Sequence, residues 1–436
     1  MNKESKNFYV FLVLIVVSFF YQFVLANSTE SKLQWFRDDK FGLFIHWGPS
    51  SMMGVEISWA RQDHPYDHPG NGPFIPNEMY DLLYRSFNPV KFDADQWMKL
   101  AKEAGFKYVV FTSKHHDGFS MWHTKLRDYN ISNTPFKRDI CRELADAAHK
   151  YGLKLGWYYS TRDWSHPDYL VGDNKKYNDF YEGQVRELLT NYGKVDIMWF
   201  DHTAGNWSDY TFERLFDMMY SLQGENLLVN NRAAKFVKGA KDSPPSPAIQ
   251  KLVDGDYDTP EQKIGKFQTD RAWESCMTMT KCEGGGWSYR PDGKTISYEE
   301  TLQTLVHTVT GDGNLLLNVG PLPTGEFPAD QVEILKKVGQ WLKKNGESIY
   351  GTRGGPLPNG KWGGMTQKGN TVYVHILDWP QDGSPLVLGA LDKKIISSKG
   401  LNVADPCVKQ TAEGIEIELP KKNRDEVDSI VVLTTE

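Results

Sequence analysis

The sequence predicts an α/β protein built on an irregular (β/α)8 barrel of the TIM type, with an antiparallel β-sandwich at its C-terminal end. The first observation is a recurring unit, in which a helical pattern is followed by a glycine turn and then by a buried apolar run. The second is that each run finishes on polar or aromatic residues, which is where such a barrel places its chemistry. The third is a change, from about Gly346, to short alternating runs between Gly, Pro and Asp turns, which is typical of a β-sandwich.

Three copies of the repeated unit stand out, at residues 105–116, 152–160 and 195–201. The last of them is predicted to be a buried parallel strand that ends on a carboxylate, at the point where the chain emerges into a loop. Burying a carboxylate is costly unless it has a partner or a task. Asp201 is therefore the first candidate for a functional residue.

The remaining elements of the barrel follow from hydrophobic periodicity. Further strands are predicted at 41–46, 227–230 and 314–319. Helices are predicted at 93–104, 138–150, 177–191, 211–222, 298–310 and 330–344. The stretch 235–259 is rich in Pro, Gly, Lys and Asp, and it is predicted to form a long surface loop over the barrel mouth.

Three regions are predicted along the chain: a signal peptide at 1–26, a catalytic barrel at 27–345 and a β-sandwich at 346–436. The leader carries Lys3 and Lys6, followed by a long apolar run that ends in residues a signal peptidase accepts. An uncleaved membrane anchor is the alternative, because the run is long for a signal. We expect an exported protein, periplasmic, secreted or in a lysosome-like lumen, without stable membrane association after cleavage.

The composition argues against some partners and leaves others open. Lys and Arg total 50 against 56 Asp and Glu, a formal charge of −6, and no long basic run occurs, so nucleic acid is not an expected partner. Aromatic residues make up 13% of the chain, which suits either contacts with sugar rings or a large core.

Of the four cysteines, only Cys276 and Cys282 lie close enough in sequence to suggest a local disulfide. The sandwich is expected to be structural, with carbohydrate binding as the alternative.

Polar side chains gather at the predicted strand ends. They are His46, His115, His116, Tyr158, Asp201 and Arg232. Histidine and aspartate are also zinc ligands, but Lys114 beside the histidine pair would oppose a cation, so neither a metal nor another cofactor is predicted. The sequence has no Gly-x-Ser-x-Gly nucleophile motif. Carboxylate chemistry on an uncharged polyol is the remaining option.

Glycoside hydrolysis needs one ionised carboxylate against the anomeric carbon and one protonated carboxyl near the leaving oxygen. Asp201 suits the first task, since histidines and an arginine around it would keep it ionised and would bind sugar hydroxyls. Glu56, Glu261 and Glu274 are candidates for the second task. Sequence spacing alone does not choose among them.

Four motifs, taken in order, resemble those of glycoside hydrolase family 29, the α-L-fucosidases. They lie at 46–48, 114–119, 199–201 and 313–321. The match runs from about residue 35 to 351 and covers the whole predicted barrel. It implies an irregular (β/α)8 barrel followed by a β-sandwich. It also implies a retaining double displacement on fucosylated oligosaccharides or glycoconjugates, through a covalent fucosyl-Asp intermediate.

The resemblance also implies roles for individual residues. Asp201 matches the family's nucleophile, and Glu261 is preferred to Glu274 as acid/base because residues 259–262 resemble the branch that favours α-1,3- and α-1,4-linked fucose. Trp287 is expected to pack against the C5 methyl group of fucose. The substrate-binding residues that the resemblance implies are His46, Glu56, Trp59, His115, His116, Tyr158, Trp199, Arg232, Glu274 and Trp287.

Two other functions stay open from the sequence. One is a catalytically inactive glycan-binding protein on the same fold, which the presence of both Asp201 and Glu261 disfavours. The other is a retaining glycosidase for another sugar, such as an α-L-galactoside, whose C6 hydroxyl a pocket closed by Trp287 would disfavour. The retaining mechanism predicts carboxyl groups about 5–5.5 Å apart, with Glu261 protonated at rest.

Overall fold

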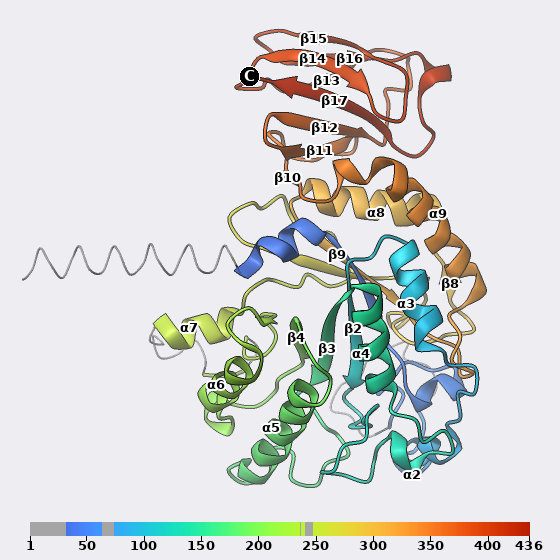
Figure 1. Cartoon of the computed structure of the whole chain (residues 1–436), viewed down its shortest axis with the longest axis vertical. Coiled ribbons are helices and arrows are strands. Elements are labelled where there is room, and N and C mark those ends of the chain that lie inside the picture. Colours follow the sequence, from blue (N-terminus) through green and yellow to red (C-terminus); the bar gives the residue numbers. More distant parts are fainter. Residues whose placement is uncertain (1–31, 63–73, 236, 240–246) are drawn as a thin grey trace, which may run out of the picture.

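A computed structural model describes residues 32–62, 74–235, 237–239 and 247–436 of the chain (Figure 1). The signal peptide predicted at 1–26 lies outside these residues. Within the described ranges, no helix has both the length and the apolar character needed to cross a membrane. The described chain forms a parallel barrel sheet, followed by antiparallel sheets near the C-terminus.

In the described residues, seven parallel strands form one sheet in the order β5-β4-β3-β2-β1-β9-β6. The strands are β1 (Phe41–Ile45), β2 (Tyr108–Lys114), β3 (Lys154–Ser160), β4 (Ile197–Asp201), β5 (Leu228–Val229), β6 (Glu274–Thr278) and β9 (Asn314–Val319). Almost all their residues are buried, as expected for parallel strands that are covered on both faces.

The segment 256–262 bridges the gap between β5 and β6. On the β5 side, the backbone N–H of Asp256 donates to the carbonyl of Val229 over 2.8 Å. On the β6 side, the backbone N–H of Gln262 donates to the carbonyl of Cys276 over 3.0 Å. Isolated parallel bridges join the same parts of the chain. The predicted (β/α)8-like barrel is therefore confirmed, with one irregular strand position.

Helices alternate with the strands and cover the barrel. They are α3 (Ala94–Glu103), α4 (Ile140–Tyr151), α5 (Lys175–Thr190), α6 (Phe212–Gln223), α7 (Pro247–Asp254), α8 (Tyr298–Thr310) and α9 (Ala329–Asn345). The side chains of Asp93, Asp139 and Ser297 cap α3, α4 and α8 by accepting a backbone N–H of the first turn. The six helices predicted from periodicity are confirmed to within two residues at each end.

One sequence expectation is corrected near the barrel closure, and one strand there is not predicted. The described part of 235–259 is not one loop, because it contains α7. The hydrophobic pattern also does not predict β6, whose five residues are Glu-Ser-Cys-Met-Thr. That strand tolerates a buried Glu274 because hydrogen bonds inside the barrel satisfy the carboxyl group.

Two antiparallel sheets follow α9 (Figure 1). The larger has the order β10-β11-β12-β17-β14 and the smaller β13-β16-β15. Their strands are β10 (Arg353–Gly354), β11 (Gly363–Lys368), β12 (Thr371–Ile376), β13 (Leu386–Leu388), β14 (Ile395–Gly400), β15 (Cys407–Gln410), β16 (Ile415–Glu418) and β17 (Ser429–Thr435). Val374 and Val431 of the larger sheet share one apolar core with Leu386 and Ile417 of the smaller, which confirms the predicted β-sandwich.

Candidate active site

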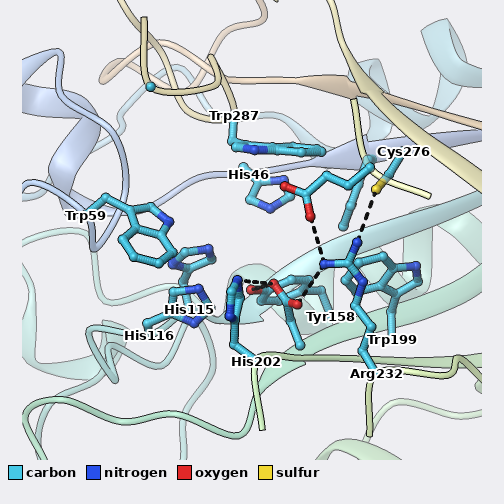
Figure 2. A pocket seen from close by; sticks show the side chains of 14 residues that line it. His46, Trp59, His115, His116, Tyr158, Trp199, His202, Arg232, Cys276 and Trp287 are labelled. Atoms are coloured by element: carbon cyan, nitrogen blue, oxygen red, sulfur yellow. Dashed lines mark hydrogen bonds and ion pairs between the residues drawn. The ribbon is translucent and has the colours of Figure 1, made fainter. Parts of the chain in front are cut away.

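A cavity of about 220 Å³ opens at the carboxyl ends of the barrel strands (Figure 2). Pockets for drug-sized ligands span about 300–1,000 Å³, so this cavity suits a single sugar ring. Ten of the twelve predicted site residues line it, and Glu56 and Glu274 do not. The complete lining is Phe44, His46, Trp59, His115, His116, Tyr158, Trp199, Asp201, His202, Arg232, Glu261, Cys276, Gly284 and Trp287.

Asp201 is the last residue of β4, and its carboxylate is held from two sides. The Tyr158 hydroxyl donates to Oδ2 over 2.9 Å, and Nη1 of Arg232 donates to Oδ1 over 2.9 Å. Burial alone would raise the pKa of Asp201, but His202 and Arg232, with these two hydrogen bonds, hold that pKa well below its ordinary value. Burial also lowers the pKa of His202, so Arg232 is the permanent positive charge beside Asp201. Asp201 is therefore ionised at neutral pH, as a nucleophile requires.

Arg232 is itself fixed by several contacts. Its Nε donates to Oγ1 of Thr259 over 2.8 Å, and its Nη2 donates to the Thr259 carbonyl over 3.0 Å. The guanidinium carbon lies 4.8 Å from the ring centroid of Trp199, at a distance typical of a cation–π contact. Because these contacts restrict the side chain, Nη1 is presented to the cavity in one position.

Glu261 comes from the segment 256–262, and like Asp201 it forms an ion pair with Arg232. Its Oε2 accepts a hydrogen bond over 2.9 Å from the same Nη1 that binds Asp201. The nearest oxygens of the two carboxylates are thus no further apart than twice 2.9 Å, in keeping with the separation of about 5–5.5 Å in retaining glycosidases. The Glu261 side chain is 41% exposed against 10% for Asp201, so Glu261 borders the cavity mouth, where a leaving group would depart.

Nη1 of Arg232 lies 2.9 Å from Oε2 of Glu261, so the two side chains form an ion pair at the cavity mouth. The expectation that Glu261 is protonated at rest stays a prediction.

Besides His202, three histidines line the same cavity: His46 follows β1, and His115 and His116 follow β2. Burial lowers the pKa of His46 to about 4, against smaller opposing effects of Asn318 and Asp201. Burial, followed by the charge on a neighbouring histidine, lowers the pKa values of His115 and His116 well below the ordinary value. The three rings are therefore uncharged at neutral pH, and they are suited to hydrogen-bond hydroxyl groups.

Aromatic rings supply the apolar part of the lining. Tyr158 and Trp199 stack with ring centroids 5.5 Å apart and planes inclined by 18°. Trp287 lies 4.9 Å from the His46 ring, and Trp59 meets His116 edge-on at 5.3 Å. Flat apolar faces beside carboxylates and histidines match a sugar ring, whose C–H faces are rimmed by hydroxyl groups.

Glu274 lies below the cavity, so the structure does not place it in contact with a substrate. Its Oε1 accepts a hydrogen bond over 3.0 Å from Nε1 of Trp199, and its Oε2 accepts one from the Tyr108 hydroxyl. Burial raises the pKa of Glu274 to about 7, despite these hydrogen bonds. The strand register explains the position: Glu274, the first residue of β6, pairs with Asn314, the first residue of β9, so it lies away from the carboxyl ends of these strands.

Glu56 is also outside the lining, because its carboxylate is used by a loop. It accepts hydrogen bonds from the backbone N–H of Trp287 over 3.1 Å and from that of Ser288 over 2.9 Å. Burial raises the pKa of Glu56 to about 6, against the lowering effect of these bonds. Glu56 therefore holds the loop that carries Trp287 and does not itself face the cavity.

Four lining residues escape the sequence reasoning: Phe44, His202, Cys276 and Gly284. His202 had an available signal, since it directly follows Asp201, and its Nε2 lies 3.9 Å from the Asp201 carboxylate. Cys276 had none, because its strand is not predicted. The suggested disulfide is wrong: Cys276 and Cys282 are both free, as are Cys141 and Cys407.

His116, Asp201 and His202 form a group of possible metal ligands in the described chain, with one ligand atom of each within 4.8 Å of the others. The donor set of two imidazoles and a carboxylate is one that zinc accepts. An ion at this place would engage the carboxylate of Asp201 and prevent it from acting as a nucleophile. The absence of a metal requirement stays a prediction.

Comparisons with known proteins point to the same chemistry. A family model described as alpha-L-fucosidase matches residues 21–347. The plasma alpha-L-fucosidase of Homo sapiens is 30% identical over 425 residues, which cover 89% of this chain and 85% of that protein. The alpha-L-fucosidase of Branchiostoma floridae is 31% identical over 383 residues, covering 81% of each chain.

Solved structures give the same result. Alpha-L-fucosidase isoenzyme 1 from Paenibacillus thiaminolyticus superposes with a TM-score of 0.81 at 34% identity, covering 94% of this chain and 99% of that one. A family 29 alpha-L-fucosidase from Bacteroides thetaiotaomicron superposes with a TM-score of 0.78 at 27% identity, covering 93% and 96%. That second structure is a trapped covalent intermediate formed with 2-fluoro-fucosyl fluoride.

Proposed function

Because this chain belongs to the alpha-L-fucosidase family, glycoside hydrolase family 29, we propose that Asp201 is its catalytic nucleophile and Glu261 its general acid/base. The chain is a retaining alpha-L-fucosidase, and its substrate is a fucosylated glycan. One observation supports the assignment of the two roles: Nη1 of Arg232 lies 2.9 Å from both carboxylates, so their nearest oxygens are no further apart than twice 2.9 Å, a limit compatible with a retaining pair.

In the first step, a carboxylate oxygen of Asp201 attacks C1 of fucose while the bond from C1 to the leaving oxygen breaks. The carboxyl proton of Glu261 passes to that leaving oxygen. The step leaves a covalent fucosyl ester on Asp201, a free aglycone and an ionised Glu261. In this step the protonated Glu261 gives up its contact with Arg232, and its side chain is partly exposed at the cavity mouth.

In the second step, Glu261 takes a proton from water, and the water oxygen attacks C1 on the face that the aglycone has left. The bond between C1 and Asp201 breaks, and the two successive inversions give fucose with retained configuration. The ion pair between Glu261 and Arg232 in the free protein matches the charge that Glu261 carries when the aglycone leaves.

The other lining residues are assigned to sugar binding. His46, His115 and His116 offer hydrogen bonds to hydroxyl groups, and Tyr158 and Arg232 hold Asp201 for attack. Trp287 packs against the C5 methyl group of fucose, supported by its place beside His46. Trp59 and Trp199 complete the apolar walls. Glu56 and Glu274 are not part of this assignment, because both are fully buried outside the cavity.

Covalent trapping tests the nucleophile directly. The full chain is incubated with 2-fluoro-fucosyl fluoride, digested and analysed by mass spectrometry. We expect one label, on the peptide that contains Asp201, and no label in Asp201→Ala. The Asp201→Ala variant should lose hydrolysis of nitrophenyl α-L-fucoside while it still binds fucose. A label on another carboxylate, or near-normal turnover by Asp201→Ala, would contradict the assignment.

The linkage preference is assigned to α-1,3- and α-1,4-linked fucose, supported by the motif at 259–262. In that motif Thr259 contacts Arg232, and Glu261 reaches the cavity mouth, where the aglycone would lie. Hydrolysis rates of trisaccharides with α-1,2-, α-1,3- and α-1,4-linked fucose test this assignment. A clear preference for the α-1,2 linkage would contradict it.

Export and the domain boundaries are further parts of the proposal. The leader at 1–26 is assigned as a cleaved signal peptide, the barrel as 27–345 and the sandwich as 346–436. N-terminal sequencing of the protein recovered from its native source tests the cleavage, and a mature chain that begins at Asn27 is expected. A mature chain that keeps the apolar run would favour the membrane-anchor alternative.

A further inference from the structure

Three of the four cavity histidines, His46, His115 and His116, are each held at Nδ1 by a polar side chain from outside the cavity lining. The partners are Ser58 for His115, Ser160 for His116 and Asn318 for His46. All three rings line the cavity (Figure 2), so Nε2 is the ring nitrogen left for a ligand. A neutral imidazole carries one proton, and the bond at Nδ1 decides which nitrogen holds it.

For His116, the proton can be placed from the partners of Ser160. Among the described residues, Oγ of Ser160 meets the backbone N–H of Arg162 at 3.1 Å and Nδ1 of His116 at 2.6 Å. An amide N–H can only donate, so Oγ accepts it. Oγ has a second lone pair, but accepting Nδ1–H as well would leave the buried hydroxyl hydrogen with no acceptor among the described residues, so this hydrogen is donated to Nδ1 of His116. Nδ1 is then the acceptor, and the ring proton lies on Nε2. That Nε2 is buried without a partner in the described chain, as a donor reserved for a ligand would be.

The same argument holds for His115. Oγ of Ser58 accepts the backbone N–H of Asp117 over 2.9 Å, and it lies 2.6 Å from Nδ1 of His115. The hydroxyl hydrogen therefore goes to Nδ1, and the ring proton lies on Nε2. Ser58 adopts φ 62°, a left-handed conformation that is costly for a residue other than glycine, and its own N–H donates to the Tyr80 hydroxyl over 2.7 Å. Its backbone is thus held in a strained position that places the hydroxyl at His115.

His46 has the opposite arrangement. Nδ2 of Asn318 donates to the carbonyl of Trp287 over 2.7 Å, and a carbonyl can only accept, so the orientation of the amide is determined. Oδ1 of Asn318 therefore faces Nδ1 of His46, 2.7 Å away, and accepts its proton. Nε2 of His46 has no proton and can only accept a hydrogen bond.

We propose that Ser58, Ser160 and Asn318 are positioning residues that set the tautomers of His115, His116 and His46, respectively. They give the sugar site two fixed donors, Nε2–H of His115 and of His116, and one fixed acceptor, Nε2 of His46. The identity of the ligand rests on the proposed function, whereas the tautomers themselves do not.

This arrangement makes a demand on the substrate. A sugar hydroxyl that faces His46 must donate its hydrogen, while oxygens that face His115 and His116 must accept. Fluorine cannot donate, so a substrate in which it replaces the hydroxyl at His46 would leave a buried acceptor unpaired. Sites built to bind a hydroxyl discriminate strongly against analogues that lack it.

Nitrogen NMR of the full chain tests the tautomers without any substrate. The protein is labelled with ¹⁵N-histidine, and His46→Gln, His115→Gln and His116→Gln variants assign the signals. At pH 7 we expect Nε2 protonated and Nδ1 bare in His115 and His116, and the reverse in His46. The opposite tautomer at any of the three, or a mixture of both, would overturn the proposal for that residue. If the wild-type chain does not hydrolyse fucosides, this would count against the proposed function, but it would not contradict the proposed tautomers.

Variants test the positioning role. Ser160→Ala should abolish the single-tautomer signal of His116 and lower kcat/KM by about tenfold, mainly through KM, because one buried hydrogen bond is lost. Ser160→Thr, which keeps the hydroxyl, should restore the tautomer. Ser348→Ala is the matched control, since Ser348 is a buried serine that bonds the carbonyl of Asn345, far from the barrel mouth. If Ser160→Ala keeps both the Nε2–H tautomer and the wild-type KM, Ser160 has no positioning role.

A second variant keeps the test decisive if Ser160→Ala does not fold. Ser58→Gly removes the hydroxyl at His115 and relieves the strain at φ 62°, so it should fold at least as well as the wild type. We expect it to lose the single-tautomer signal of His115 and to raise KM, with the signal of His116 unchanged. A His115 signal that stays on Nε2–H in Ser58→Gly would overturn the role of Ser58.

Discussion

The carboxylates of Asp201 and Glu261 accept hydrogen bonds from one and the same guanidinium nitrogen, each over 2.9 Å. That nitrogen belongs to Arg232, whose Nε and Nη2 donate to Thr259 and whose Nη2 also donates to Sγ of Cys276 over 4.0 Å. A single side chain thus sets both the spacing of the proposed catalytic pair and the charge next to it. Substitutions of Arg232, Glu261 and Asp201 should therefore have different effects on activity, because each residue has a different chemical task.

Arg232→Gln should lower kcat by about 10²-fold, because it removes a preorganised charge and donor from the reacting carboxylates. Loss of that charge raises the pKa of Asp201, which must be ionised to attack, so the acid limb of the pH profile should move to higher pH. The measurement is kcat against pH on nitrophenyl α-L-fucoside. Arg271→Gln is the control, since Arg271 pairs with Asp258 outside the cavity lining. An acid limb that does not move would count against Arg232 as the source of the low pKa.

Glu261→Ala should lose about 10²–10⁴-fold in activity on substrates with poor leaving groups. Azide should restore turnover on an activated fucoside and give fucosyl azide with retained configuration, because the fucosyl-Asp201 ester still forms. In Asp201→Gly, azide should instead give the inverted fucosyl azide. Product configuration by NMR separates the two cases. Azide rescue in Glu274→Ala, with none in Glu261→Ala, would transfer the acid/base role to Glu274.

Glu274→Gln should weaken the pH dependence of stability. Burial raises the pKa of Glu274 from 4.5 to about 7, so the folded state binds more protons than the unfolded state between these values. The free energy of unfolding therefore falls as the pH rises through that window, by about 3 kcal/mol for this group. Glutamine imitates the protonated form, since its amide can donate to Tyr108 and accept from Trp199.

Urea unfolding of the wild type and of Glu274→Gln at pH values from 4 to 8 measures this difference. Glu213→Gln, an exposed position on α6, serves as the control for loss of a charge. The two curves should converge at low pH and separate as the pH rises, with the variant more stable above pH 7. Parallel curves would show that Glu274 does not titrate between those values.

Trp287→Ala should relax the choice of sugar. If Trp287 packs against the C5 methyl group, its removal opens space for the C6 hydroxyl of an α-L-galactoside. The kcat/KM for the α-L-fucoside divided by that for the α-L-galactoside should then fall about tenfold. Competition between the two nitrophenyl glycosides measures the ratio. Trp362→Ala, a partly buried tryptophan of the C-terminal sandwich, is the matched control. An unchanged ratio in Trp287→Ala would place the methyl group elsewhere in the cavity.

The sequence by itself determined the barrel, most of its elements and the proposed nucleophile. Asp201 ends an apolar run, and His46 and the pair His115–His116 follow two others, so their places at the strand ends are legible from near neighbours. Burial, alternation and helical periodicity are local properties of a chain. Family motifs lie at these same strand ends, which is why ten predicted residues line the cavity.

Only the tertiary structure decided which carboxyl group lies opposite Asp201. The backbone of Glu261 forms a β-bridge with Cys276, whereas Glu274 lies two residues before Cys276 on β6. Glu261 therefore reaches the rim, and Glu274 is buried beside Tyr108 and Trp199. The segment around Glu261 has no strand pattern of its own, because its course is set by hydrogen bonds to β5 and β6. The depth of a side chain in a barrel depends on this register between distant strands, and no periodicity within one segment encodes it.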